Sequence, residues 1–240
     1  SKIGLNLAIN YSINFDLPKR GKSSIKFIII HYTGMKKESA AIKRLCDSKS
    51  KVSSHYFIRN NGELLNLVPD LYIAWHAGDS RWKSFKSLNK HSIGIEINNP
   101  GHDHGYKKFS SKQILSLVKL LGFLTKKYNV KKQNILGHSD ISPNRKKDPG
   151  EKFPWKKLAK KNLCKWHTLN EIKIKKYRNL KINKTKEKIF FDNLYKFGYH
   201  KIDRNKKTSL IKTFQRKFRQ NLVNGKIDQE CYLISQNLLK

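Results

Sequence analysis

The segment Phe27-Ile28-Ile29-Ile30 constrains the fold more than any other stretch of the chain. An uninterrupted apolar run of this length is typical of a strand that is buried on both faces. His31 follows the run directly, and Tyr32-Thr33-Gly34 then breaks the pattern, so the histidine is predicted at the end of the strand. A strand of this kind indicates a sheet with further elements packed on both sides.

Other segments before residue 160 supply those elements. The sequence predicts a helix over 36–47, a hairpin of strands over 52–58 and 63–68, a strand over 92–98, and a helix from about 110 to 128 that begins with an S-x-x-Q capping box. Strands and helices alternate here, with a hairpin between them. The predicted fold class is therefore α/β, with a mixed β-sheet flanked by helices.

The stretch from Asn134 to Trp155 has no helical or strand period after its first few residues, and it is rich in ligand-type side chains. Residues 134–136 indicate a short strand, which places His138 just past its carboxyl end, and Asp148 follows ten residues later. Together with His31, these residues offer two nitrogens and one oxygen. That set suits a catalytic zinc, which keeps a fourth position for water. With nine histidines in the chain, chance assembly is the alternative.

Glu96 lies in the middle of the predicted strand SIGIEIN. The three isoleucines point to one face of this strand, and Glu96 points to the other. A carboxylate in such a strand is costly to bury unless it is paired or bound. An ion pair with one of the many lysines would explain it. The functional interpretation is a general base beside a metal, which passes a proton from water to a leaving group.

Five segments, in this order along the chain, resemble the zinc-dependent N-acetylmuramoyl-L-alanine amidases: FIIIHYTGM, VSSHYFI, AWHAGDSRW, SIGIEINN and GHSDISPNRKKDPGEKFPW. The resemblance is to the AmiD/AmpD type, whose fold is shared with phage amidases and animal peptidoglycan recognition proteins. It covers roughly residues 12 to 160, and it includes an SINFD segment that looks like the SPNFD entry of the family.

The resemblance implies an activity and a set of residues that carry it. The implied reaction is zinc-dependent hydrolysis of the amide bond between N-acetylmuramic acid and L-alanine in peptidoglycan or muropeptides. His31, His138 and Asp148 are the implied zinc ligands, Glu96 is the catalytic carboxylate, and Lys146 is the catalytic lysine. Only the family motif selects Lys146, because Arg145 and Lys147 lie on either side of it.

Four further residues are candidates for substrate binding: His55, Trp75, His76 and Arg145. A hydrogen-bonded histidine on a sheet face is the alternative for His55, and simple packing is the alternative for Trp75. The aromatic-His-Gly loop that begins at Trp75 is a plausible wall for a groove that binds a sugar-peptide. Arg145 would meet the acidic stem peptide. His102 and His104 lie in a polar loop and are interpreted as solvated rather than as a metal tract.

The chain changes character after residue 160. Residues 161–188 are rich in Lys, Asn and Thr and indicate a connector, although some isoleucines in it are too apolar for a free linker. Residues 189–240 predict a small domain of three helices, which resembles the peptidoglycan-binding domain often appended to wall hydrolases. A helical appendage that only stabilises the enzyme is the alternative. The predicted catalytic domain is then 1–160.

The charge is extreme, with 52 Lys and Arg against 17 Asp and Glu, a net charge of +35. It indicates either attraction to a polyanion or a lysine-rich composition spread over the surface. Signatures of nucleic-acid-binding modules are absent, so no specific nucleic acid partner is expected. A basic nucleic-acid-binding protein is one rival function. A non-catalytic peptidoglycan receptor is the other, although such proteins typically lose a zinc ligand.

The cellular location of the protein is judged from two kinds of segment, transmembrane segments and signal peptides. The longest apolar runs fall far short of the ~20 residues that cross a bilayer, so no transmembrane segment is predicted. Residues 1–30 show no signal-peptide pattern, so either a leader was removed or the protein is cytosolic. The prediction is a monomer in the cell envelope or periplasm, with the cytoplasm as the alternative. Three widely spaced cysteines imply no disulfide framework.

Overall fold

The structure is a computed structural model that describes residues 11–240. Residues 1–10, which belong to the predicted catalytic domain, lie outside the described part. The centre is a five-stranded sheet in the order β4-β3-β8-β2-β9, in which β4 alone is antiparallel to its neighbour. Its strands are β2 (Phe27–Tyr32), β3 (Tyr56–Ile58), β4 (Leu64–Asn66), β8 (Ser92–Ile97) and β9 (Ile135–Gly137). The predicted mixed sheet is confirmed.

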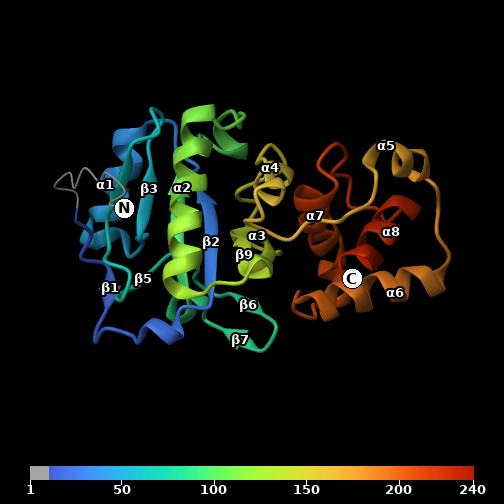
Figure 1. The fold of residues 1–240 in the computed structure, drawn as a ribbon, viewed down its shortest axis with the longest axis horizontal. Helices are drawn as coiled ribbons and strands as arrows, with labels where there is room; N and C mark the ends of the chain where they lie inside the picture. The colour runs from blue at the N-terminus through green and yellow to red at the C-terminus, as the bar shows by residue number, and fades with distance from the viewer. Residues whose placement is uncertain (1–10) are drawn as a thin grey trace.

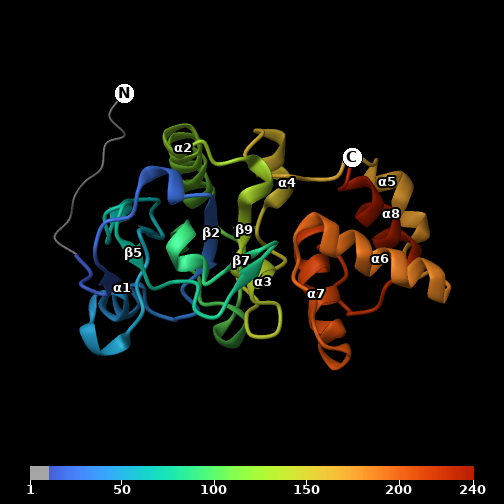
Figure 2. The same cartoon turned by 90° about the horizontal axis from the view of Figure 1, so that it is seen from below.

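Helices flank this sheet. They are α1 (Glu38–Cys46), α2 (Ser111–Tyr128), α3 (His138–Ile141), α4 (Trp155–Lys160), α5 (Glu171–Ile174), α6 (Lys184–Phe197), α7 (Lys207–Phe218) and α8 (Gln229–Asn237). In Figures 1 and 2, α2 runs across one face of the sheet, and α5 to α8 gather beyond β9. The predicted capping box is present, because the Ser110 hydroxyl accepts from the backbone of Gln113, whose side chain bonds back to Ser110.

Shorter elements connect the helices and the sheet. Two small sheets are formed by β1 (Phe15–Asp16) with β5 (Ile73–Ala74), and by β6 (Arg81–Trp82) with β7 (Phe85–Lys86). Single 3-10 turns are η1 (Lys22–Ser24), η2 (Ser48–Ser50), η3 (Leu88–His91), η4 (His102–His104), η5 (Lys132–Asn134), η6 (Lys175–Tyr177) and η7 (Arg204–Lys206).

Successive side chains of β2 point to opposite faces of the sheet, and each face has its own apolar core. Ile28 and Ile30 face α2 and pack with the isoleucines of β8 against the leucines of that helix. Phe27 and Ile29 face the other way. Each such side chain contributes roughly 1.5–3 kcal/mol when fully buried. The sheet is thus covered on both faces, as the apolar run predicted.

The second face of the sheet is covered by two different parts of the chain. Near β3, Phe57 packs under α1. Near β2 and β9, one apolar cluster joins Phe27 and Leu136 of the sheet to Phe214 and Phe218 of α7. Trp82 of the β6–β7 hairpin bridges the two sides, because its ring contacts Tyr199 with centroids 4.9 Å apart. The C-terminal helices therefore share a core with the sheet.

Three predicted segments differ from the structure. The strand predicted over 52–58 is regular only over β3, because the serines before it bond to loops: the Ser53 amide donates to the carbonyl of residue 75. The region after residue 136 was predicted to be irregular, but α3 forms at once after β9. The segment 161–188 contains α5 and the start of α6, with Ile174 buried and Ile172 87 % exposed. The division into domains stays a prediction.

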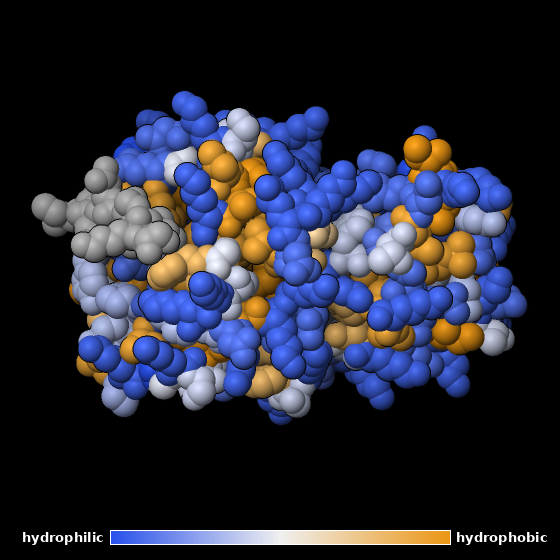
Figure 3. Space-filling model, in the orientation of Figure 1, coloured by the Kyte–Doolittle hydropathy of each residue, from blue (hydrophilic) through white to orange (hydrophobic). Residues whose placement is uncertain are grey.

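One face of the molecule is drawn in space-filling form in Figure 3, and hydrophilic side chains predominate on it. On the face drawn in Figure 3, hydrophilic side chains extend over the sheet domain and the C-terminal helices alike, with apolar patches between them. Among the described helices, none has the length and apolar character that a membrane span requires.

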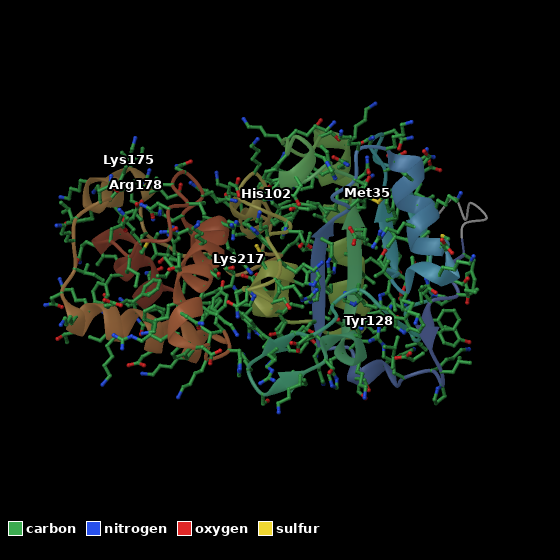
Figure 4. The ribbon with its side chains drawn as sticks, turned by 180° about the vertical axis from the view of Figure 1, so that it is seen from behind. Met35, His102, Tyr128, Lys175, Arg178 and Lys217 are labelled. Carbon is green, nitrogen blue, oxygen red and sulfur yellow. The ribbon has the colours of Figure 1, made fainter. Side chains whose placement is uncertain are left out.

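Asp70 anchors a buried polar cluster beside α2. Its carboxylate accepts hydrogen bonds from the hydroxyls of Tyr56 and Tyr128, both at 2.6 Å, and from the Lys127 ammonium at 2.8 Å. Tyr128 is labelled in Figure 4. Burial raises the pKa of Asp70, but hydrogen bonds from Lys127, Tyr128 and Tyr56 outweigh that effect and leave the pKa below its usual value.

We expect Asp70→Asn to lower the free energy of unfolding by about 1–3 kcal/mol at pH 7, because it weakens hydrogen bonds to a buried charge. The folded pKa of Asp70 lies below the unfolded value of about 3.9. Its contribution is therefore present above about pH 4 and is lost as the pH falls through the folded pKa. Urea unfolding of both proteins at pH 7 and pH 3 measures this; an undiminished difference at pH 3 would contradict it.

Candidate functional site

Three neighbouring parallel strands end at the same place and bring the candidate residues together. In the register of β2 and β8, His31 is paired with Glu96. In the register of β2 and β9, Ile30 is paired with Gly137, so His138 begins beside His31. Paired residues of adjacent strands point to the same face, so His31 and Glu96 emerge side by side. The carboxyl ends of strands are the usual place for a site in an open α/β sheet.

His31, His138 and Asp148 form a buried cluster. The two Nδ1 atoms are 2.9 Å apart, and Asp148 Oδ2 lies 3.2 Å from Nδ1 of His31 and 3.1 Å from Nδ1 of His138. One ligand atom from each residue lies within 4.8 Å of the others. Two nitrogens and a carboxylate oxygen that converge on one point fit the ligand set of a divalent metal such as zinc.

The protonation states also suit a metal. Burial, followed by the neighbouring His138, lowers the pKa of His31 to about 4, so this ring is neutral at pH 7. Burial raises the pKa of Asp148, but the two histidines outweigh it and hold that pKa well below the usual range. His138 Nε2 donates to the carbonyl of Ala77 at 3.1 Å, so in the neutral form of this ring Nδ1 carries the lone pair. The buried site is thus compatible with metal binding.

A chain of hydrogen bonds assigns the tautomer of His31. The Ser92 hydroxyl donates to the carbonyl of Leu88 at 2.6 Å, so it accepts from Nε2 of His76 at 3.2 Å. Nδ1 of His76 then accepts from Nε2 of His31 at 3.0 Å. Nδ1 of His31 therefore carries no hydrogen, and its lone pair faces Asp148. Partners of this kind orient metal-binding histidines in proteins.

His76 and His55 both pack against the β8 backbone at Gly94, and their ring centroids are 5.7 Å apart. A Cβ at Gly94 would lie 2.4 Å from the ring of His76, so this position requires glycine. His55 Nδ1 accepts from the amide of Gly94, and its Nε2 donates to the carbonyl of Tyr72. Among the described residues, His76 lines the cavity at the site and His55 does not. His55 therefore has its hydrogen bonds inside the protein, as its alternative interpretation expected.

Glu96 is the least satisfied group of the site. Its Oε2 is buried, and no described residue donates a hydrogen bond to it. Burial, followed by the charge of Asp148, raises the pKa of Glu96 to about 8. The lysine ion pair considered as an explanation is not found among the described residues. A carboxylate in this state is suited to proton transfer.

A cavity of about 550 Å³ opens over these groups. Its lining includes Trp75, whose indole donates to Asp16 at 2.8 Å, and Lys146. Arg145 also lines it, with its guanidinium held by the carbonyls of residues 77 and 79. Arg44 of α1 adds a cation that the sequence analysis missed, because no motif marks one basic residue of a basic helix. Away from the candidate metal ligands, the wall of the cavity thus combines several cations with apolar and polar side chains.

His102 differs from its prediction. Its Nδ1 lies 2.8 Å from the Tyr32 hydroxyl, its Nε2 lies 3.1 Å from Glu151, and its ring stacks on Tyr106. Figure 4 shows His102 and Met35 near the end of the sheet where the site lies. The interpretation of His102 as solvated was therefore wrong, because Tyr32 and Glu151, both distant in sequence, bond to its ring and Tyr106 stacks on it. His104 is exposed, as expected.

The comparisons with known proteins agree with this geometry. The family model described as N-acetylmuramoyl-L-alanine amidase matches residues 21–151. The amidase AmiD of Escherichia coli (strain K12) is 32 % identical over 231 residues, which cover 90 % of this chain and 83 % of the relative. The 1,6-anhydro-N-acetylmuramyl-L-alanine amidase AmpD of Haemophilus influenzae is 37 % identical over 108 residues, 45 % of this chain and 56 % of the relative.

Solved structures extend the likeness to the whole chain. The complex of Escherichia coli AmiD with anhydro-N-acetylmuramic acid-L-Ala-D-gamma-Glu-L-Lys has a TM-score of 0.80 and 31 % identity, and covers 93 % of this chain and 92 % of the other. AMPDH3 from Pseudomonas aeruginosa has a TM-score of 0.79 and 28 % identity, and covers 97 % of each chain. The region matched by the family model contains His31, His138 and Asp148, and the chain belongs to the N-acetylmuramoyl-L-alanine amidase family.

Proposed function

We propose that this protein hydrolyses the amide bond between N-acetylmuramic acid and L-alanine in peptidoglycan or muropeptides, with zinc held by His31, His138 and Asp148. The observation that carries the proposal is the convergent buried ligand cluster beside Glu96, whose Oε2 has no hydrogen-bond partner among the described residues. The likeness to an AmiD complex with a muropeptide supports the substrate class. The non-catalytic receptor is disfavoured, because all three ligand residues are present and close together.

Each residue has a distinct role in the proposed reaction. Zinc, when bound, supplies Lewis acidity that polarises the amide carbonyl and acidifies water. Glu96 accepts a proton from the attacking water and then donates it to the nitrogen of the leaving amine. The pKa of about 8 describes the metal-free site, where the carboxyl group is protonated at pH 7. The charge of a bound divalent cation would lower this pKa and favour the carboxylate form that acts as the base. Lys146 stabilises the negative charge that develops on the carbonyl oxygen.

The cationic lining fits the carboxylates of a stem peptide. Arg145 and Arg44 stand on the cavity wall, and the guanidinium of Arg145 is fixed by backbone carbonyls. A positioned guanidinium is a strong partner for a carboxylate. Trp75 offers an aromatic surface to a sugar or peptide. We propose these residues, with His76, as the substrate-binding wall.

The remaining assignments concern the rest of the chain. We propose residues 161–188 as a connector and 189–240 as a peptidoglycan-binding helical domain. The expected location is the cell envelope or periplasm, with the cytoplasm as the alternative, and the expected state is a monomer. A nucleic-acid-binding protein is disfavoured, because the cavity opens over the convergent side chains of His31, His138 and Asp148.

The test is digestion of purified sacculi and, separately, of soluble 1,6-anhydro-muropeptides, followed by mass spectrometry. We expect release of peptides that begin with L-alanine, loss of that release with a chelator, and recovery with added zinc. Release that a chelator does not affect would reject the zinc assignment. No release from either substrate would reject the function.

Lys146 can be separated from the many other lysines by a matched pair of variants. We expect Lys146→Met to reduce turnover by roughly 10²–10³-fold with zinc retained, which is the usual effect of losing one donor to a developing oxyanion. Lys157→Met makes the same change on the exposed side of α4 and should leave turnover unchanged. Steady-state hydrolysis of a soluble muropeptide measures both; equal rates for the two variants would remove Lys146 from the mechanism.

A further inference from the structure

A buried ion pair joins α7 to the turn that carries a metal-binding histidine. Lys217 Nζ lies 2.6 Å from Asp140 Oδ2, and these side chains are only 4 % and 2 % exposed. The two residues are 77 positions apart in the sequence. Figure 4 shows Lys217 between the C-terminal helices and the sheet. Buried charges of this kind persist only when they are paired and hydrogen-bonded.

Asp140 connects this pair to His138. Its Oδ2 also accepts from the amide of Gly137 at 2.8 Å, and its Oδ1 accepts from the Tyr199 hydroxyl at 2.7 Å. The first of these bonds closes the start of α3, where His138 is the first residue. The other two partners, Lys217 and Tyr199, come from the C-terminal region. The backbone position of His138 thus depends on contacts with Tyr199 and Lys217, which both lie in the C-terminal region.

The same helix also reaches the segment that follows Asp148. Just after α7, the Gln220 amide donates to the carbonyl of Phe153 at 2.7 Å. Arg216 Nε lies 3.8 Å from Glu151 Oε2. The Lys217 ammonium lies 4.3 Å above the ring of Trp155. Residues in α7 and just after it therefore contact two of the three chain segments that present candidate ligands, the segments of His138 and Asp148.

We propose that α7 is a positioning element of the metal centre, in which Lys217 acts through Asp140 to hold His138 where it can bind the metal. The inference rests on the proposed zinc site and adds to it. Lys217 does not touch the ligand atoms, so its effect is on the geometry of the cluster. The C-terminal helices are then required for a complete site, whether or not they also bind the wall.

The test compares two buried ion pairs. Lys217→Met breaks the pair that holds α3, whereas Arg178→Met breaks the pair with Glu230, whose bonds of 2.6 and 2.8 Å lie wholly within the C-terminal region. Zinc affinity is measured by competition with a chromophoric chelator, and Tm is measured for the metal-free proteins. We expect Lys217→Met to weaken zinc binding by roughly 10–100-fold, as for other partners that orient ligands.

Arg178→Met should lower Tm and leave the zinc affinity unchanged, and Lys217→Arg should restore most of the lost affinity. Parental zinc affinity in Lys217→Met, or an equal loss in Arg178→Met, would overturn the inference. If Lys217→Met does not fold, Tyr199→Phe decides, because it keeps both charges and removes one hydrogen bond to Asp140. Unchanged zinc affinity in Tyr199→Phe would then reject it. Failure of the parent protein to bind zinc would instead reject the proposed metal site.

Discussion

Replacing His31, His138 or Asp148 by alanine is expected to remove zinc and hydrolysis together. In the part of the chain that the structure describes, these three residues form the group whose ligand-type atoms converge, so each variant would leave two protein ligands. Residues that merely orient a ligand cost roughly 10–100-fold in affinity when they are lost, so a ligand itself should cost more. Elemental analysis of purified variants and muropeptide hydrolysis measure the two effects.

His104→Ala is the matched control for the ligand variants, because it removes an exposed histidine outside the cluster. It should retain about one zinc per chain and parental turnover. A ligand variant that kept both full zinc content and full turnover would show that its residue does not bind the metal. Zinc retained without turnover would point to a different role for that residue.

Glu96→Gln is expected to separate metal binding from chemistry. The amide keeps the shape of the side chain and cannot act as a base, so zinc should remain bound while turnover falls by roughly 10²–10⁴-fold. Glu187→Gln, on the exposed surface of α6, should have no effect. A Glu96→Gln enzyme within a few-fold of the parent would remove this residue from the reaction.

The same substitution should stabilise the metal-free protein in alkaline solution. The pKa of Glu96 is about 8 in the folded protein and 4.5 in the ordinary case. Between pH 4.5 and pH 8, the folded state therefore keeps a proton that the unfolded state has lost. Stability therefore falls as the pH rises from about 4.5 to 8. Glu96→Gln removes this loss. Urea unfolding of chelated protein at pH 4 and pH 9 should show a gain at pH 9 only.

The sequence predicted those parts of the fold that depend on local patterns. The apolar run before His31 indicated a strand buried on both faces, and the capping box at Ser110 marked the start of α2. Both are found, because neighbouring residues alone determine them. The cluster of His31, His138 and Asp148 could also be predicted, since each residue was placed at the end of a strand or in the loop after one.

Other features depend on partners far away in the sequence. Lys217 is one of many lysines, and nothing near it in the chain indicates a buried partner at Asp140. His102 was interpreted from its polar loop, whereas Tyr32, Tyr106 and Glu151 decide its environment. The hydrogen-bonded role of His76 likewise requires Ser92, which a pattern of strand residues does not reveal. Tertiary contacts determine each of these.

The ion pair between Asp140 and Lys217 has a consequence for the time at which the enzyme becomes active during its synthesis. Lys217 emerges from the ribosome 77 residues after Asp140. At synthesis rates of 5–20 residues per second, that interval is about 4–15 s. For most of that interval, the nascent chain contains the three candidate metal ligands but not yet α7, which supports them. Under our inference, a growing chain binds zinc roughly 10–100-fold more weakly until α7 has docked, and full hydrolytic capacity follows that step.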